Sequence, residues 1–235
     1  MKIVMVHPHD VYSHPWMIRP IKIAEELIRR GHSVSLCFIP EHKRRCGFGI
    51  IHKNLPPQLE LVPLKWARRD TLKNAKIIEN TARNADIIHI QKADSSTALP
   101  GILAAYRLNL PIHYDWDDWE TEILKEMKYS GPKVFDFSWY EKLMPRFVDT
   151  LSVSSQALKE IATERRMQQD RIFPAPVGAD LEFFNPKISG EEVKVKHNIK
   201  GPAVIYAGQL DGANYLELLI RAIPMVNQSR PETTF

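Results

Sequence analysis

Short apolar runs alternate along this chain with segments in which apolar residues recur every three or four positions. The runs IVMV, VSLCFI and DIIHI, which begin at residues 3, 34 and 86, are apolar without alternation. Such runs are typical of strands covered by helices on both faces of a parallel sheet. Apolar residues at positions 23, 24, 27 and 28 share one face of a helix predicted over residues 19–30, and Gly31 then stops it. The pattern predicts a doubly wound α/β fold.

The same patterns place the remaining elements. Strands are predicted at residues 2–6, 32–39, 59–64, 86–91, 111–115, 150–153 and 171–174. Helices are predicted at residues 19–30, 70–83, 97–108, 139–147 and 156–166. We expect Lys2–Val6 to be a central strand. Sheets of this kind bind ligands beyond the carboxyl ends of their strands, so the segments that follow each strand are the candidate sites.

The chain changes character after residue 186. Residues 1–186 are predicted to form a Rossmann-like domain, and residues 187–202 a charged linker bracketed by prolines. Residues 203–235 predict a buried strand, a turn and an amphipathic helix, the opening unit of a second domain. One strand and one helix cannot bury a core. We therefore expect this unit to self-associate, as in a homo-oligomer, or to be completed by a second chain that supplies the missing lobe.

Composition narrows the classes of partner. The net charge of +4 and pI near 9.0 suit an anionic ligand or membrane surface, but the charge is too scattered to indicate nucleic acid. Two cysteines make no disulfide framework, and no apolar run is long enough to span a bilayer. We expect a cytoplasmic protein. The basic and apolar stretch at residues 40–57 indicates peripheral contact with a bilayer or a lipid-linked acceptor, unless it is simply a solvated loop.

A histidine-rich segment, HPHDVYSHPW, follows the first strand at residues 7–16. His-x-His with a nearby acid can ligate zinc, but the spacing is weak, and the favoured interpretation is a polar ligand loop without metal. His9 and Asp10 are its candidate binding residues. The segment contains no G-x-G-x-x-G motif, which counts against a dinucleotide-dependent dehydrogenase.

An acidic and aromatic segment, YDWDDWE, follows the fifth strand at residues 114–120. Asp117 and Asp118 there could orient a nucleophile or bind sugar hydroxyls, and Trp116 could stack on a sugar face. The alternative is an acidic helix N-terminus stabilised by the helix dipole. The crowding of like charge favours function. Ser154, after the sixth strand, precedes a helix whose amides could bind an anion, although simple capping would also explain a serine there.

Six segments together resemble a known family. They are RPIKIAEELIRRGHSVSL (19–36), NADIIHIQ (84–91), PIHYDWDD (111–118), VDTLSVSSQALKE (148–160), IFPAPVGADLEFFNP (172–186) and AVIYAGQLDGANYLELLIRA (203–222). In this order they resemble motifs of the retaining GT-B glycosyltransferases of family 4, from the N-terminal domain into the start of the C-terminal domain.

The resemblance implies transfer of a sugar, with retention, from a nucleotide-sugar donor to a polysaccharide, lipid-linked or other glycan acceptor. It implies no cofactor and no metal for the chemistry. The first domain would bind the acceptor and the second the donor, so this chain alone is expected to be inactive. The catalytic candidates it implies are Asp117 and Asp118. The substrate-binding candidates are His9, Asp10, Trp116, Ser154, Gly178, Gly208 and Gln209.

Departures from the family pattern keep two alternatives open. Gln209 and Asn214 stand where the family carries an arginine and a lysine that face the donor diphosphate, and the first loop has His-Pro-His-Asp in place of a Gly-Gly pair. A non-catalytic nucleotide-sugar-binding or accessory protein derived from a transferase is one alternative. A GT-B sugar-nucleotide epimerase is the other.

Overall fold

A computed structural model gives the fold, and it describes residues 1–41, 49–208 and 215–235. These residues divide into two compact units. The first comprises Met1–Lys125 and Tyr129–Val177, and the second Glu126–Lys128 and Gly178–Phe235. This division falls a few residues before the boundary predicted from the sequence, and the domain limits at residues 186 and 202 stay predictions.

The first unit is built on a seven-stranded sheet in the order β3-β2-β1-β4-β5-β6-β7, in which every pairing is parallel. The strands are β1 Lys2–His7, β2 Ser33–Phe38, β3 Glu60–Pro63, β4 Ile87–Gln91, β5 Ile112–Trp116, β6 Thr150–Val153 and β7 Ile172–Pro174. The predicted doubly wound class and the inner position of the first strand are confirmed. Unbroken apolar runs identified the inner strands β1, β2 and β4 because these are covered on both faces.

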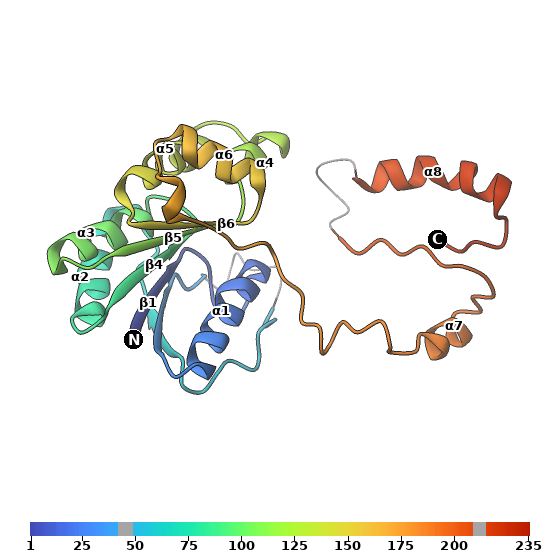
Figure 1. Cartoon of the computed structure of the whole chain (residues 1–235), viewed down its shortest axis with the longest axis horizontal. Coiled ribbons are helices and arrows are strands. Elements are labelled where there is room, and N and C mark those ends of the chain that lie inside the picture. Colours follow the sequence, from blue (N-terminus) through green and yellow to red (C-terminus); the bar gives the residue numbers. More distant parts are fainter. Residues whose placement is uncertain (42–48, 209–214) are drawn as a thin grey trace. The chain divides into compact units, whose positions relative to one another are not determined.

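Helices cover the two faces unequally. The helices of the first unit are α1 Ile18–Arg29, α2 Thr71–Ala82, α3 Ala98–Leu108, α4 Glu120–Glu126, α5 Pro132–Phe147 and α6 Gln156–Glu164, with a short 3₁₀ turn, η1, at Pro15–Met17. Buried residues of α2, α3, α5 and α6 form one apolar cluster with β4, β5 and β6. Helix α1 packs on the opposite face, over β1 and β2 (Figure 1).

Strand order fixes where a ligand site can form. The chain runs outward from β1 to β2 and β3, then returns to add β4 on the other side of β1. The connections after β1 and β4 therefore leave the sheet in opposite directions, and doubly wound folds bind ligands in the crevice at such a switch point, here at the carboxyl ends of β1 and β4. His7 ends β1 and Gln91 ends β4, so both face this switch point.

Two glycines have defined roles in this fold. Gly31 has φ +83°, and its N–H and that of His32 donate to the carbonyls of Ile28 and Leu27, which closes α1 as predicted. Gly101 in α3 lies so close to the sheet that a Cβ there would be 2.8 Å from Cδ1 of Ile90. Helix α3 can approach β4 this closely only because position 101 has no side chain.

The second unit departs from the sequence prediction. A strand was expected at residues 203–208, but Ala203 forms only an isolated bridge with Thr234, and Ile205 is 82% exposed. No described residue of this unit offers a neighbouring strand, so the apolar run lacks the pairing that would make it one. The predicted linker contains a short helix, α7 Glu191–Lys196. The amphipathic helix predicted within residues 203–235 forms as α8 Tyr215–Ser229.

Two further differences concern the first unit. Helix α5 begins at Pro132, seven residues before the predicted start at Trp139, and α4 follows the acidic segment directly. The first half of α5 and the whole of α4 were missed because aromatic and charged residues occupy exposed positions there and hide the apolar periodicity. Within the described ranges, no helix is both long and apolar enough to cross a bilayer.

We predict that Gly101→Val lowers the free energy of unfolding by about 1–3 kcal/mol, because the added side chain overpacks the contact with Ile90. Tyr106→Val is the matched control, since Tyr106 lies in the same helix and is 86% exposed. The control should cost no more than about 0.5–1 kcal/mol. Urea denaturation of both variants measures the difference, and equal stabilities would contradict the close packing of α3.

Candidate functional site

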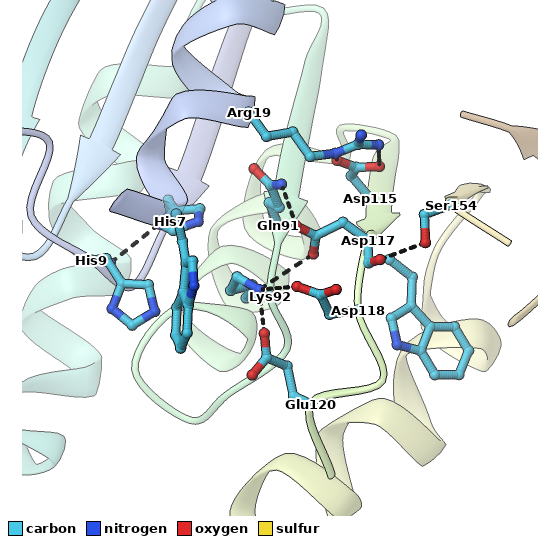
Figure 2. Close-up of polar contacts among 12 residues, drawn as sticks. His7, His9, Arg19, Gln91, Lys92, Asp115, Asp117, Asp118, Glu120 and Ser154 are labelled. Atoms are coloured by element: carbon cyan, nitrogen blue, oxygen red, sulfur yellow. Dashed lines mark hydrogen bonds and ion pairs between the residues drawn. The ribbon is translucent and has the colours of Figure 1, made fainter. Parts of the chain in front are cut away.

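The polar residues at the carboxyl ends of β4 and β5 meet across the sheet. Gln91 is the register partner of Asp115, and the chain leaves these strands through Lys92 and through Trp116–Asp117. Nε2 of Gln91 donates to Oδ2 of Asp117 at 3.2 Å. Figure 2 shows this group, with the carboxylates of the β5 loop turned toward the end of β4. Parallel pairing therefore brings together residues about 25 positions apart in sequence.

Lys92 is the centre of the group. It has φ +61°, an uncommon conformation for a residue with a side chain, and it is 2% exposed. Its Nζ lies 3.2 Å from Oδ2 of Asp118 and 3.5 Å from Oδ1 of Asp117, and it also pairs with Glu120. Burial alone would lower the pKa of Lys92, but these carboxylates raise it above its ordinary value. Lys92 is therefore held charged in a buried position.

The three carboxylates around Lys92 differ in access. The side chains of Asp117 and Glu120 are 11% and 7% exposed, whereas that of Asp118 is 46% exposed. Burial raises the pKa of Asp117, and the negative charge of Asp118 raises it further. The ammonium of Lys92 has the opposite effect but is a weaker influence than burial. When all three are ionised, the group carries two negative charges in excess. Asp118 is the member that can contact a ligand directly.

The loop that carries Lys92 is fixed by its own hydrogen bonds. Asp94 accepts from the N–H groups of Ser96 and Thr97 at 3.0 and 3.1 Å, and from both of their hydroxyls. The hydroxyl of Thr97 also donates to the carbonyl of Lys92 at 3.2 Å. A second anchor is Asp136 of α5, which accepts from the N–H and hydroxyl of Ser95. These contacts set the left-handed turn that buries Lys92.

Ser154 takes part in the site through a backbone contact. Its hydroxyl donates to the carbonyl of Asp117, and so it holds the acidic loop against the end of β6. The capping role belongs to the next residue, Ser155, which accepts from the N–H of Leu158 at 3.3 Å at the start of α6. The structure thus assigns the two serines different tasks.

A buried ion pair borders the cluster on the α1 side. Nε and Nη2 of Arg19 donate to both oxygens of Asp115 at 2.8 and 2.9 Å, and Nη2 also donates to the carbonyl of Ala175 at 3.0 Å. Ser152 donates to Asp115 at 2.6 Å. Burial would raise the pKa of Asp115, but the guanidinium of Arg19 holds it below its ordinary value. This pair fixes the end of β5 to α1 and to the segment after β7.

The histidine loop is organised by Asp10. This carboxylate accepts from the N–H groups of Tyr12, Ser13 and Glu41 at 2.9, 3.0 and 3.2 Å. It therefore shapes the loop from inside, and in this structure it faces backbone rather than the crevice. Its neighbour His9 stacks on the ring of His14.

His7 and His9 present unused polar atoms. His7 is fully buried, and its Nδ1 accepts from the N–H of His9 at 3.2 Å, so its Nε2 carries the proton. Burial lowers the pKa of both rings well below the ordinary value, which keeps them neutral. Nε2 of each is buried, with no hydrogen-bond partner among the described residues. A buried donor without a partner is costly, and this applies to Nε2–H of His7, whose tautomer is set by His9 N–H.

The loop also contains a group that could be considered for a metal. Ligand atoms of His9, His14 and Glu41 lie within 4.8 Å of one another. The rings of the two histidines, however, are stacked 3.9 Å apart at 10°. Parallel rings at this separation cannot both aim an in-plane lone pair at one ion about 2 Å away. Nδ1 of His14 also accepts from the N–H of Trp16, which leaves the proton on Nε2. The absence of a metal stays our prediction.

Trp116 lies in the core rather than in the crevice. It is 1% exposed, stacks near Tyr114 and donates from Nε1 to Glu141 at 3.3 Å. Strand alternation turns Asp115 toward α1 and Trp116 toward α5, so no ring face is open to a sugar. The aromatic ring beside the cluster is that of Trp16, 40% exposed, with Nζ of Lys92 5.0 Å from its centroid.

The other candidates belong to the second unit. Gly178 and Gly208 are both exposed, and a Cβ on Gly208 would meet the hydroxyl of Tyr206 at 2.8 Å. Gln209 and Asn214 lie outside the described residues, as do residues 42–48 of the predicted basic loop.

Sequence reasoning missed Lys92, Arg19 and Gln91. For Gln91 and Lys92 the available signal was their position at the end of an apolar strand. For Arg19 it was a place in the first turn of a helix that packs on the sheet. Without a known fold, nothing paired them with acids elsewhere in the chain.

A parallel sheet with this strand order and helices on both faces is a Rossmann-like arrangement, which the N-terminal half of GT-B proteins shares. The family model described as glycosyl transferase 4-like domain matches residues 22–178. The chain belongs to this family. A search of curated proteins found no match.

Solved structures agree on the fold. A glycosyltransferase from Rickettsia africae is 18% identical, with a TM-score of 0.64 over 97% of this chain and 57% of that one. Anabaena Alr3699/HepE in complex with UDP-glucose is 16% identical, with a TM-score of 0.64 over 100% and 59%. A putative UDP-N-acetylglucosamine 2-epimerase from Listeria monocytogenes is 12% identical, with a TM-score of 0.60 over 99% and 60%. The chain thus spans less than two thirds of the length of these relatives.

Glu141 gives the site a pH-dependent neighbour. Its carboxylate is buried against Trp116 and Thr121, and burial raises its pKa to about 7. An acid with a raised folded-state pKa stabilises the fold below its unfolded pKa, and this contribution is lost as pH rises through about 7.

We predict that Glu141→Gln, which mimics the protonated acid, gains stability relative to the unmodified chain as pH rises from about 5 to about 8. The relative gain should reach at most about 3 kcal/mol. Urea denaturation across this range measures it. Glu122→Gln, on the exposed part of α4, should show no such trend. A constant difference between Glu141→Gln and the unmodified chain would show that Glu141 is not the titrating group.

Proposed function

We propose that this chain is the acceptor-side half of a retaining glycosyltransferase. The reaction transfers a sugar from a nucleotide-sugar donor to a hydroxyl of a polysaccharide, lipid-linked or other glycan acceptor. Membership of the glycosyl transferase 4-like family supports the reaction class. The UDP-glucose complex of the Anabaena relative supports a uridine-diphosphate sugar as the donor class.

The observation that carries the proposal is the surplus of carboxylates at the switch-point crevice. One ammonium, that of Lys92, faces three carboxylates, and the accessible one belongs to Asp118. The transition state of glycosyl transfer resembles an oxocarbenium ion and carries positive charge near the anomeric carbon. A fixed negative group stabilises such charge when it is preorganised and shielded from water. The same excess of negative charge makes this crevice a poor place for a diphosphate.

The residues then divide the work. Asp118 accepts a hydrogen bond from a substrate hydroxyl and stabilises the developing positive charge. Asp117 acts as a positioning residue, because its oxygens are held by Gln91 and Lys92. His9 is assigned to acceptor binding in this proposal from its place in the loop after β1, while its Nε2 and that of His7 are both buried.

The proton balance requires no cofactor in this scheme. The acceptor oxygen bonds to the anomeric carbon as the bond from that carbon to the donor phosphate breaks. The acceptor proton passes to the departing phosphate oxygen on the same face, which retains the configuration. The donor side of the site, to which Gly208 and Gln209 would contribute, belongs to the second lobe in this proposal. Closure of the two lobes would exclude water.

The two alternatives differ in their products. An epimerase is favoured by the fold likeness to the Listeria protein, and it would invert a nucleotide sugar with no acceptor present. A binding protein is favoured by Gln209 and Asn214, which lack the charge expected opposite a diphosphate. It would return the nucleotide sugar unchanged. Mass spectrometry of products from a panel of nucleotide sugars, with and without glycan acceptors, separates the three outcomes.

We predict that Asp118→Asn lowers transfer at least about tenfold in a form of the protein that carries both lobes, because the accessible carboxylate is lost. Glu122→Gln is the matched control, an acid on α4 four residues away that pairs with Lys125 at 2.6 Å. It should keep full turnover. Equal rates for the two variants would remove Asp118 from the chemistry.

A further inference from the structure

The exposed face of helix α5 has an unusual composition. Every residue of α5 in the exposed class is aromatic, cationic or proline, and none is acidic. The set, called here the α5 face, consists of Pro132, Lys133, Phe135, Trp139, Lys142, Arg146 and Phe147. A helix side turned to water would ordinarily carry charges of both signs and few large apolar groups.

Its aromatic residues are organised rather than scattered. Phe135 and Trp139 are one helical turn apart, with ring centroids 6.1 Å apart at 25°, and they are 67% and 52% exposed. Tyr129 precedes the helix at 52% exposure, and Nζ of Lys133 lies 5.1 Å from its ring centroid. Paired aromatic rings with a cation beside them are typical of side chains that lie at a membrane–water interface.

The acidic residues of the helix are turned inward. Glu141 is buried against Trp116 and Thr121, and Asp136 is half-buried and holds Ser95. The outward charge of α5 is therefore entirely positive, from Lys133, Lys142 and Arg146. This positive charge complements an anionic surface. The aromatic rings between the cations would be buried favourably only if that surface has an apolar layer beneath its charged groups, as a lipid bilayer has.

From these observations we propose that the α5 face binds the surface of an anionic lipid bilayer. The aromatic rings enter the interfacial layer, and the cations contact the phosphate groups of the lipids. The residues of the α5 face are not those of the basic stretch 40–57 that the sequence indicated. If the proposed transferase function holds, it also favours a lipid-linked acceptor, because Asp136 ties the N-terminal half of α5 to the loop of Lys92 through Ser95.

Vesicle flotation of the 235-residue chain tests the proposal without reference to catalysis. Binding is expected to phosphatidylcholine vesicles that contain phosphatidylglycerol, and to be weak to phosphatidylcholine alone. Phe135→Ser/Trp139→Ser and Lys142→Glu/Arg146→Glu should each reduce binding at least about tenfold, because each removes one of the two contributions. The matched controls are Trp66→Ser/Leu72→Ser and Lys73→Glu/Lys76→Glu, exposed residues elsewhere on the first unit. Circular dichroism verifies that all four variants keep the fold.

Three outcomes would overturn the proposal. One is failure of the unmodified chain to float with anionic vesicles, and another is equal loss in the α5 variants and the controls. The third is self-association without lipid that Phe135→Ser/Trp139→Ser abolishes, since the face would then contact a second copy of the chain. Loss of binding confined to the two α5 variants supports the bilayer.

Discussion

A single buried ammonium sets the constraints of this site. The Nζ of Lys92 is enclosed by carboxylates that come from one short segment after β5, and it compensates the charge of the two buried ones, Asp117 and Glu120. The acidic loop, the left-handed turn after β4 and the start of α4 are therefore fixed by the same interaction. Removal of the cation would leave Asp117 and Glu120 as uncompensated charges in a nearly dry environment.

Polar interactions continue from this cluster across the α1 side of the sheet. Asp115 holds Arg19 and Ser152, and the hydroxyl of Ser152 lies 3.0 Å from Nε2 of His113. Arg19 in turn donates to the carbonyl of Ala175, where the chain leaves the last strand. On the α1 side, hydrogen bonds thus join the carboxyl ends of β5, β6 and β7, whose other face packs in the apolar cluster. Through Arg19, the position of the acidic loop after β5 is linked to that of Ala175, in the segment that follows β7.

Periodicity was sufficient to predict the sheet, because strands covered on both faces leave an unbroken apolar record. It was not sufficient for the site. Asp117 and Asp118 were found from their place after a strand, but their partner Lys92 lies on another strand's loop, and only the pairing of β4 with β5 shows the contact. The side chain of Trp116 was predicted to be open to a sugar but points into the core. Its neighbour Asp115 is bound by Arg19 of α1, and side chains alternate along a strand, so Trp116 faces the opposite side. The run at residues 203–208 was apolar enough for a strand, but among the described residues it pairs only through one bridge, Ala203 with Thr234.

The most direct test of this account is a double-mutant cycle on the buried pair of Lys92 and Glu120, read by urea denaturation. Lys92→Met should lower the free energy of unfolding by about 3–5 kcal/mol, because it leaves buried carboxylates unpaired. Lys92→Met/Glu120→Gln should recover at least about 1 kcal/mol relative to the sum of the single changes. Lys125→Met, which breaks an exposed pair with Glu122, should cost less than about 1 kcal/mol. Additive effects, or a Lys92→Met cost no larger than that of Lys125→Met, would contradict the central role of Lys92.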